Sequence, residues 1–185
     1  MNPRTTLFFV LIFAISAGSI LAASSPALWI DVPFVAQTQD GCGSAAISMV
    51  MQYWERNLRH AVPDLADPER IQSALYSRTA HGISSAGMEE YFRTAGYRAY
   101  AFRGDWNDLS HNVEAGRPLI VSLKASGPLG PLHYVVVVGI DDVRGFLYIN
   151  DPAQQKNLRI SREGLESEWN STHHWTLLAL PQSGD

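Results

Sequence analysis

The stretch that says most about the fold is HYVVVVGI, residues 133–140. Its unbroken run of β-branched valines has the length of a strand and favours burial on both faces of a sheet. Arg144 and Gly145 then supply a turn, and residues 146–150 return as the next strand. The two strands are therefore expected to form an antiparallel hairpin.

Helical signals precede this hairpin. Apolar residues recur at helical spacing behind Cys42, so a buried helix is expected to begin there and to end at about Arg56. Capping residues and glycine stops predict three shorter helices, at about residues 67–77, 84–96 and 105–115. Short strands are expected at residues 28–34, 98–102, 118–123 and 175–180. Because helices come first and hairpin-linked strands come late, the order predicts an α+β fold, with a helical N-terminal part packed on an antiparallel β-sheet.

Composition limits the classes of protein to consider. The chain has 185 residues, of which 46% are hydrophobic and 17% charged, which suits a globular core and excludes disorder, collagen and coiled coil as the main architecture. The 14 basic and 18 acidic residues form no run of like charge, so no nucleic-acid partner is expected. Cys42 is the only cysteine, which rules out an intrachain disulfide.

The N-terminus has the character of a targeting segment. Residues 1–23 contain one Arg, then an apolar core, then small residues, as in a secretory signal peptide cleaved after Ala22 or Ala23. An uncleaved membrane anchor is the alternative, because residues 5–23 nearly reach the roughly 20 apolar residues that span a bilayer. Residues 24–185 are then expected to form a single exported domain, periplasmic or secreted, with no stable membrane insertion after cleavage.

Three residues form a candidate catalytic group. Cys42 is predicted at a helix N-terminus, where unpaired N–H groups favour an anionic sulfur. His133 begins the valine strand and Asp151 ends its hairpin partner, so antiparallel pairing brings both to the same end of the sheet. Thiol attack on a carbonyl needs a base and a group that orients the base. Each residue alone has an ordinary structural explanation; the combination predicts a nucleophile, a general base and an orienting carboxylate.

A further donor must stabilise the oxyanion formed on the attacked carbonyl. Gln37 lies five residues before the thiol, on the loop that leads into the helix, and is the first candidate beside the backbone N–H of Cys42. Gln39 is the second.

These segments together resemble a known family. In order along residues 29–175 they are similar to the bacteriocin-processing, double-glycine-leader cysteine peptidases and their papain-like relatives, through Asp31-Val32-Pro33, Gln37, Cys42-Gly43, Gly82-Ile83-Ser84, His133-Tyr134 with the valines and Gly139, and Asp151-Pro152. The resemblance implies a papain-like cysteine peptidase fold with Cys42 as nucleophile, His133 as general base and acid, Asp151 orienting the histidine, and Gln37 lining the oxyanion hole.

The expected function is therefore that of an exported cysteine peptidase that cleaves a peptide or protein substrate, for example a secreted peptide or its leader. Small residues in the loop 126–131 are expected to wall the cleft and suit glycine at the cut. Transfer of the acyl group to an amine would use the same residues. Two other functions stay open: a non-catalytic papain-like module that binds peptides or a secretion-system partner, and a thiol amidase that acts on peptidoglycan.

No cofactor is expected. The chain has no glycine-rich phosphate loop, so no nucleotide is implied. His173 and His174, with His81 or His111, invite a metal interpretation. Neighbouring residues on a strand point to opposite faces, however, so the adjacent pair is not expected to hold one ion.

Overall fold

The computed structural model describes residues 27–124 and 132–182. Its strands are β1 (Leu28–Trp29), β2 (Tyr97–Arg103), β3 (Leu119–Lys124), β4 (Leu132–Asp141), β5 (Phe146–Asn150), β6 (Leu158–Ser161) and β7 (Trp175–Pro181). Its helices are α1 (Cys42–Leu58), α2 (Pro68–Leu75), α3 (Ser85–Thr94), α4 (Trp106–Glu114) and α5 (Arg162–Trp169), with short 3₁₀ helices η1 (Asp64–Ala66) and η2 (Asn170–Thr172). The expected signal peptide at residues 1–23 and the expected cleft wall at 126–131 lie outside the described residues.

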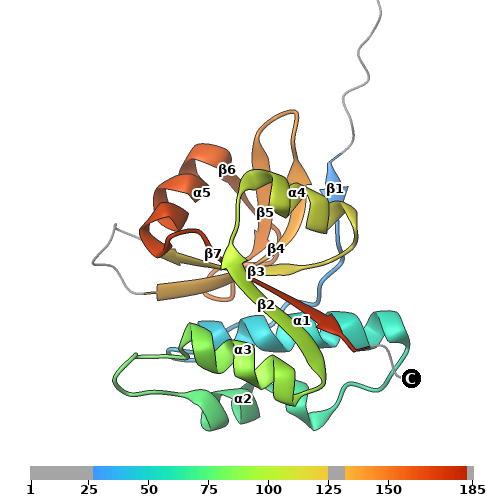
Figure 1. Ribbon diagram of the computed structural model, residues 1–185, viewed down its shortest axis with the longest axis vertical. Coiled ribbons are helices and arrows are strands. Elements are labelled where there is room, and N and C mark those ends of the chain that lie inside the picture. The colour runs from blue at the N-terminus through green and yellow to red at the C-terminus, as the bar shows by residue number, and fades with distance from the viewer. Residues whose placement is uncertain (1–26, 125–131, 183–185) are drawn as a thin grey trace, which may run out of the picture.

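The strands form one antiparallel sheet in the order β2-β7-β3-β4-β5-β6, and β1 pairs with the far end of β4. The predicted valine strand is β4, which lies inside the sheet, and its residues 134–141 are all buried. Figure 1 shows why: α1, α2 and α3 gather on one side of the strands, and α4 and α5 lie on the other. The expected α+β fold, with an antiparallel sheet, is confirmed.

The predicted helices begin where their capping residues place them. Asp67 accepts hydrogen bonds from the backbone N–H groups of Glu69 and Arg70 at the start of α2, and Ser84 accepts one from Gly87 at the start of α3. Asp105 forms a capping box at the start of α4. Such local bonds satisfy N–H groups that have no partner within the helix, which is why these starts could be predicted without tertiary information.

Two parts of the fold differ from the prediction. The first strand is only Leu28–Trp29. The backbone N–H of Ile30 still binds the carbonyl of Val138, but the carbonyl of Val32 accepts from the side-chain amide of Asn150. Strand β6 and helix α5 were not predicted. Helix α5 buries only Leu165 and Trp169, too few apolar positions to give a helical period.

The β4–β5 hairpin carries a bulge between Val137 and Gly139. Gly139 is needed at this point, because a Cβ there would lie 2.9 Å from the carbonyl oxygen of Leu28 on β1. On the N-terminal side of the bulge in β4, Val136 pairs with Asn150. Asp151, the residue that follows β5, therefore lies at the end of the sheet at which β4 begins.

Candidate active site

The sulfur of Cys42 lies at the start of the buried helix α1, as expected, and the residue is partly exposed. The N-cap residue, Gly41, offers no side chain to the first turn, and the first turn contains no acidic residue. The positive end of the helix dipole can therefore act on a negative charge at the sulfur or on a bound carbonyl.

His133 and Asp151 form a direct pair. Nε2 of His133 lies 2.8 Å from Oδ1 of Asp151, whose side chain is only 4% exposed. Because Asp151 occupies Nε2, the other ring nitrogen, Nδ1, is the one left for the sulfur of Cys42. The structure thus brings together the three residues that the sequence singled out.

This pairing changes the protonation of both groups. Burial alone would lower the pKa of His133, but hydrogen bonds with Asp151 and Cys42 outweigh burial and raise it to about 9. Burial would raise the pKa of the Asp151 carboxyl, but its contacts with His133 and with two neighbouring donors lower it. At neutral pH the histidine is therefore a cation held against an ionised aspartate.

Two donors besides His133 hold the Asp151 carboxylate. The backbone N–H of Ala153 binds Oδ1 at 2.9 Å, and the side-chain amide of Gln154 binds Oδ2 at 2.6 Å. These bonds fix the plane of the carboxylate toward Nε2. Gln154 was not predicted, because only the tight turn after β5 brings its amide back to Asp151.

Gln37 and Gln39 occupy different environments. The side chain of Gln37 lines the same cavity as Cys42 and His133, and its backbone N–H binds the carbonyl of Pro152 at 2.9 Å. Its Oε1 is buried without a hydrogen-bond partner in the described part of the chain. Gln39 is exposed and does not line this cavity. The structure therefore places Gln37, and not Gln39, in the cavity that contains the thiol.

A buried residue that the sequence reasoning missed, Asn150, ties this loop to the sheet. Its amide lies within hydrogen-bond distance of the carbonyls of Val32 and Pro33, and its Oδ1 accepts from the backbone N–H of Asn157. Asn150 directly precedes Asp151, so one short segment positions both the carboxylate and the loop that carries Gln37.

The candidate site opens into a cavity of about 440 Å³. Its walls come from the loops around α1 and α2, from the β3–β6 end of the sheet and from α5, and they are lined by Gln37, Asp40, Cys42, His81, Leu123, Leu132, His133, Ile149, Asp151, Ala153, Gln154, Leu158, Ile160 and Glu168. The sulfur and the imidazole are thus accessible to a ligand.

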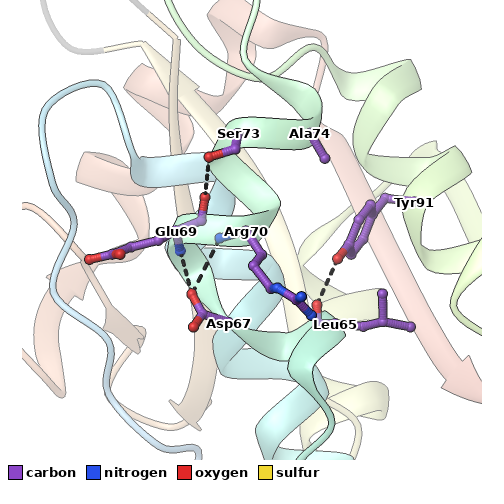
Figure 2. A pocket seen from close by; sticks show the side chains of 7 residues that line it. All are labelled: Leu65, Asp67, Glu69, Arg70, Ser73, Ala74 and Tyr91. Atoms are coloured by element: carbon purple, nitrogen blue, oxygen red, sulfur yellow. Dashed lines mark hydrogen bonds between the residues drawn. The ribbon is translucent and has the colours of Figure 1, made fainter.

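A larger hollow of about 620 Å³ lies elsewhere, between α2 and α3. Figure 2 shows that its polar groups serve the local structure: Asp67 caps α2, and the hydroxyl of Tyr91 donates to the carbonyl of Leu65. Neither a cysteine nor a histidine lines it. The cavity at Cys42 is therefore the candidate active site.

The histidines that the sequence suggested as metal ligands do not form a metal site within the described residues. His173 and His174 precede β7 and both have positive φ, so the expectation that they lie on a strand is wrong. His174 stacks on Trp169, and its Nε2 lies 3.3 Å from Glu166. Residues 27–124 and 132–182 contain no group of three His, Cys, Asp or Glu side chains arranged to hold a metal ion.

The helices within the described ranges are all too short or too polar to cross a membrane.

Three solved structures with a similar fold are described as peptidases or proteases. A protein from Bacillus anthracis described as a C39-like peptidase has a TM-score of 0.67 at 17% identity, covering 86% of this chain and all of the other. A double glycine motif protease from an AMS/PCAT transporter, solved with its leader peptide, has a TM-score of 0.60 at 21% identity, covering 83% and 94%. Xylellain, a cysteine protease from Xylella fastidiosa, has a TM-score of 0.61 at 13% identity, covering 90% of each chain.

No curated protein sequence matches the chain. Because the solved structures share so little sequence identity with this chain, their similarity establishes only a shared fold. The sequence model of one protein family, however, matches residues 29–176, which is most of the chain. The protein therefore belongs to the Peptidase_C39 like family and is a cysteine-type peptidase.

Proposed function

We propose that Cys42, His133 and Asp151 are the catalytic triad of this peptidase and that Gln37 completes its oxyanion hole. The observation that carries the proposal is the position of the His133 ring, which is hydrogen-bonded to Asp151 and lines one solvent-accessible cavity with Cys42. A nucleophile, a base and an orienting carboxylate in that relation are the arrangement that acyl transfer requires.

The reaction begins with Cys42 as thiolate and His133 as imidazolium. The sulfur attacks the peptide carbonyl carbon, a C–S bond forms, and the carbonyl electrons move to oxygen. Nδ1 of His133 then gives its proton to the leaving nitrogen as the C–N bond breaks. Water attacks the resulting thioester, passes a proton to Nδ1, and releases the acid and the thiolate. Asp151 keeps the ring in position and stays ionised, since three donors already hold it.

The oxyanion has two candidate donors. The backbone N–H of Cys42 lies in the uncapped first turn of α1, and the side-chain amide of Gln37 lines the cavity beside it. Donors fixed before the reaction stabilise the developing charge without reorganisation, which is the largest single contribution in many acyl-transfer enzymes.

The substrate is a peptide or protein outside the cytoplasm. The composition of residues 1–23 supports export. The fold likeness to a transporter protease solved with a leader peptide supports a peptide as ligand and a secretion-system component as partner.

The proposal is tested by measuring, with mass spectrometry, the rate at which iodoacetamide alkylates Cys42 at pH 6. The wild type is expected to react at least tenfold faster than free cysteine, and His133→Ala is expected to lose this advantage. His111→Ala is the matched control, because His111 lies on α4 outside the cavity and leaves the thiol unchanged. Equal rates for the wild type and free cysteine would favour a non-catalytic binding module.

Turnover is then measured on unfolded casein and on purified peptidoglycan, with Cys42→Ala as the inactive variant. Cleavage of casein supports the peptidase function. Release of peptides from peptidoglycan without cleavage of casein would instead indicate a thiol amidase.

A further inference from the structure

The cavity beyond His133 has aliphatic walls. Five apolar side chains from four adjacent strands line it: Leu123 on β3, Leu132 on β4, Ile149 on β5, and Leu158 and Ile160 on β6. Leu158 pairs in register with Ile149, and Leu123 with His133, so these walls continue directly from the proposed base. A substrate side chain beside the scissile bond would lie along them.

Three carboxylates line the same cavity, and two have partners. Asp151 binds His133, and Asp40 accepts a hydrogen bond from the hydroxyl of Tyr76 at 3.3 Å. Within the described residues Glu168 has neither a hydrogen bond nor an ion pair, although it is half-buried. No Lys or Arg is among the described residues that line the cavity.

The helix holds Glu168 at this place. Leu165 and Trp169 are buried and anchor α5, which contacts β3, β5 and β6. Glu168 lies next to Trp169 and three residues after Leu165, at the border of the buried stripe, so its carboxylate reaches the cavity while its helix stays fixed.

We propose that this cavity binds a Lys or Arg side chain of the substrate, with Glu168 as the residue that selects it. The aliphatic stem packs against the leucines and isoleucines, and the cationic end meets the carboxylate of Glu168. A half-buried charge without a partner is costly, and a cationic ligand removes that cost, whereas an acidic one increases it. The inference rests on the proposed peptidase function and names its substrate class: peptides with a basic residue beside the cut.

The test compares three series of peptides, which carry Lys, norleucine or Glu. In each series the residue is placed at one of four positions: the two residues before the scissile bond and the two residues after it. Norleucine has the same stem as Lys without its charge. At one of these positions the wild type is expected to cleave the Lys peptide about tenfold more efficiently, in kcat/KM, than the norleucine peptide, and the Glu peptide less efficiently than either. Glu168→Gln is expected to bring the ratio of Lys to norleucine close to one.

The matched control is Glu163→Gln, which removes an acid from the exposed face of the same helix and should keep the tenfold ratio. The preference should also weaken as salt rises, because part of it is a screened charge interaction. A wild-type ratio near one at every position, or a ratio that survives in Glu168→Gln, overturns the proposal.

Failure of catalysis is separated from failure of this inference by binding. If the enzyme cleaves none of the peptides, the same three series are titrated onto Cys42→Ala, with and without Glu168→Gln. Tighter binding of Lys peptides that depends on Glu168 supports the inference without turnover, and equal binding overturns it.

Discussion

Nε2–H of His133 donates a hydrogen bond to Oδ1 of Asp151 at 2.8 Å, across 18 residues of chain. The bond joins the start of one strand to the end of its hairpin partner, so it depends on the register of the sheet and not on any local turn. It also decides which ring nitrogen faces Cys42, and the proposed mechanism follows from that assignment.

Replacement of Asp151 by Asn tests the orienting carboxylate. The shape is kept, but the charge that raises the pKa of His133 is lost, so kcat is expected to fall by about 10²–10⁴-fold. The alkaline limit of activity, expected near pH 9 in the wild type, should move to lower pH. Profiles of kcat and of kcat/KM against pH measure both changes, and an unchanged alkaline limit would contradict the assigned role.

Gln37→Ala tests the oxyanion donor. Loss of one such donor is expected to lower kcat by about 10²–10³-fold, with KM little changed, because the bond strengthens in the transition state. Gln39→Ala, which alters an exposed side chain outside the cavity, is the matched control. Equal effects of the two substitutions in steady-state kinetics would rule out a specific role for Gln37.

Gln154→Ala tests the support of the carboxylate. Without the 2.6 Å bond to Oδ2, Asp151 is held less firmly and is less stabilised as an anion, so kcat should fall about tenfold and the acidic limit of activity should move to higher pH. Gln155→Ala serves as the control, since only the backbone carbonyl of Gln155 contacts Asp151. A purely structural role for Gln154 would leave the acidic limit where it is.

The His133 pair also links stability to pH. Folding raises the pKa of His133 from 6.5 to about 9, so its contribution to the free energy of unfolding is complete below pH 6.5 and is lost as pH rises through 9. Urea denaturation at pH 6, 7.5 and 9.5 should show a decline on the order of 1–3 kcal/mol in the wild type. His133→Gln should show a smaller decline across the same window; an identical slope would mean that other groups cause it.

Gly43→Ala tests how closely the start of α1 is packed. A Cβ at this position would lie 2.9 Å from Cβ of Ile83, so the first turn, and Cys42 with it, must shift. The free energy of unfolding is expected to fall by about 1–3 kcal/mol, as for other overpacked sites. Gly87→Ala in α3 meets only the hydroxyl of Ser84 at 3.2 Å and should be neutral or stabilising by calorimetry.

Much of the fold was readable in the sequence because its signals are local. The valine run, the turn at Arg144 and Gly145, and the caps Asp67, Ser84 and Asp105 each act within a few residues, and the corresponding elements lie where they were predicted. Strand β6 escaped prediction because four residues at a sheet edge are defined by their pairing with β5, which no local pattern records.

The candidate site divides in the same way. The residue types and their order were sufficient to single out Cys42, His133 and Asp151, since thiol chemistry needs a base and a carboxylate and the hairpin brings the last two together. Tertiary structure alone distinguished Gln37 from Gln39, added Gln154 behind the carboxylate, and brought Glu168 from a distant helix to the cavity. A side chain's chemistry is encoded at its own position, but its distance from another side chain depends on how every element between them packs.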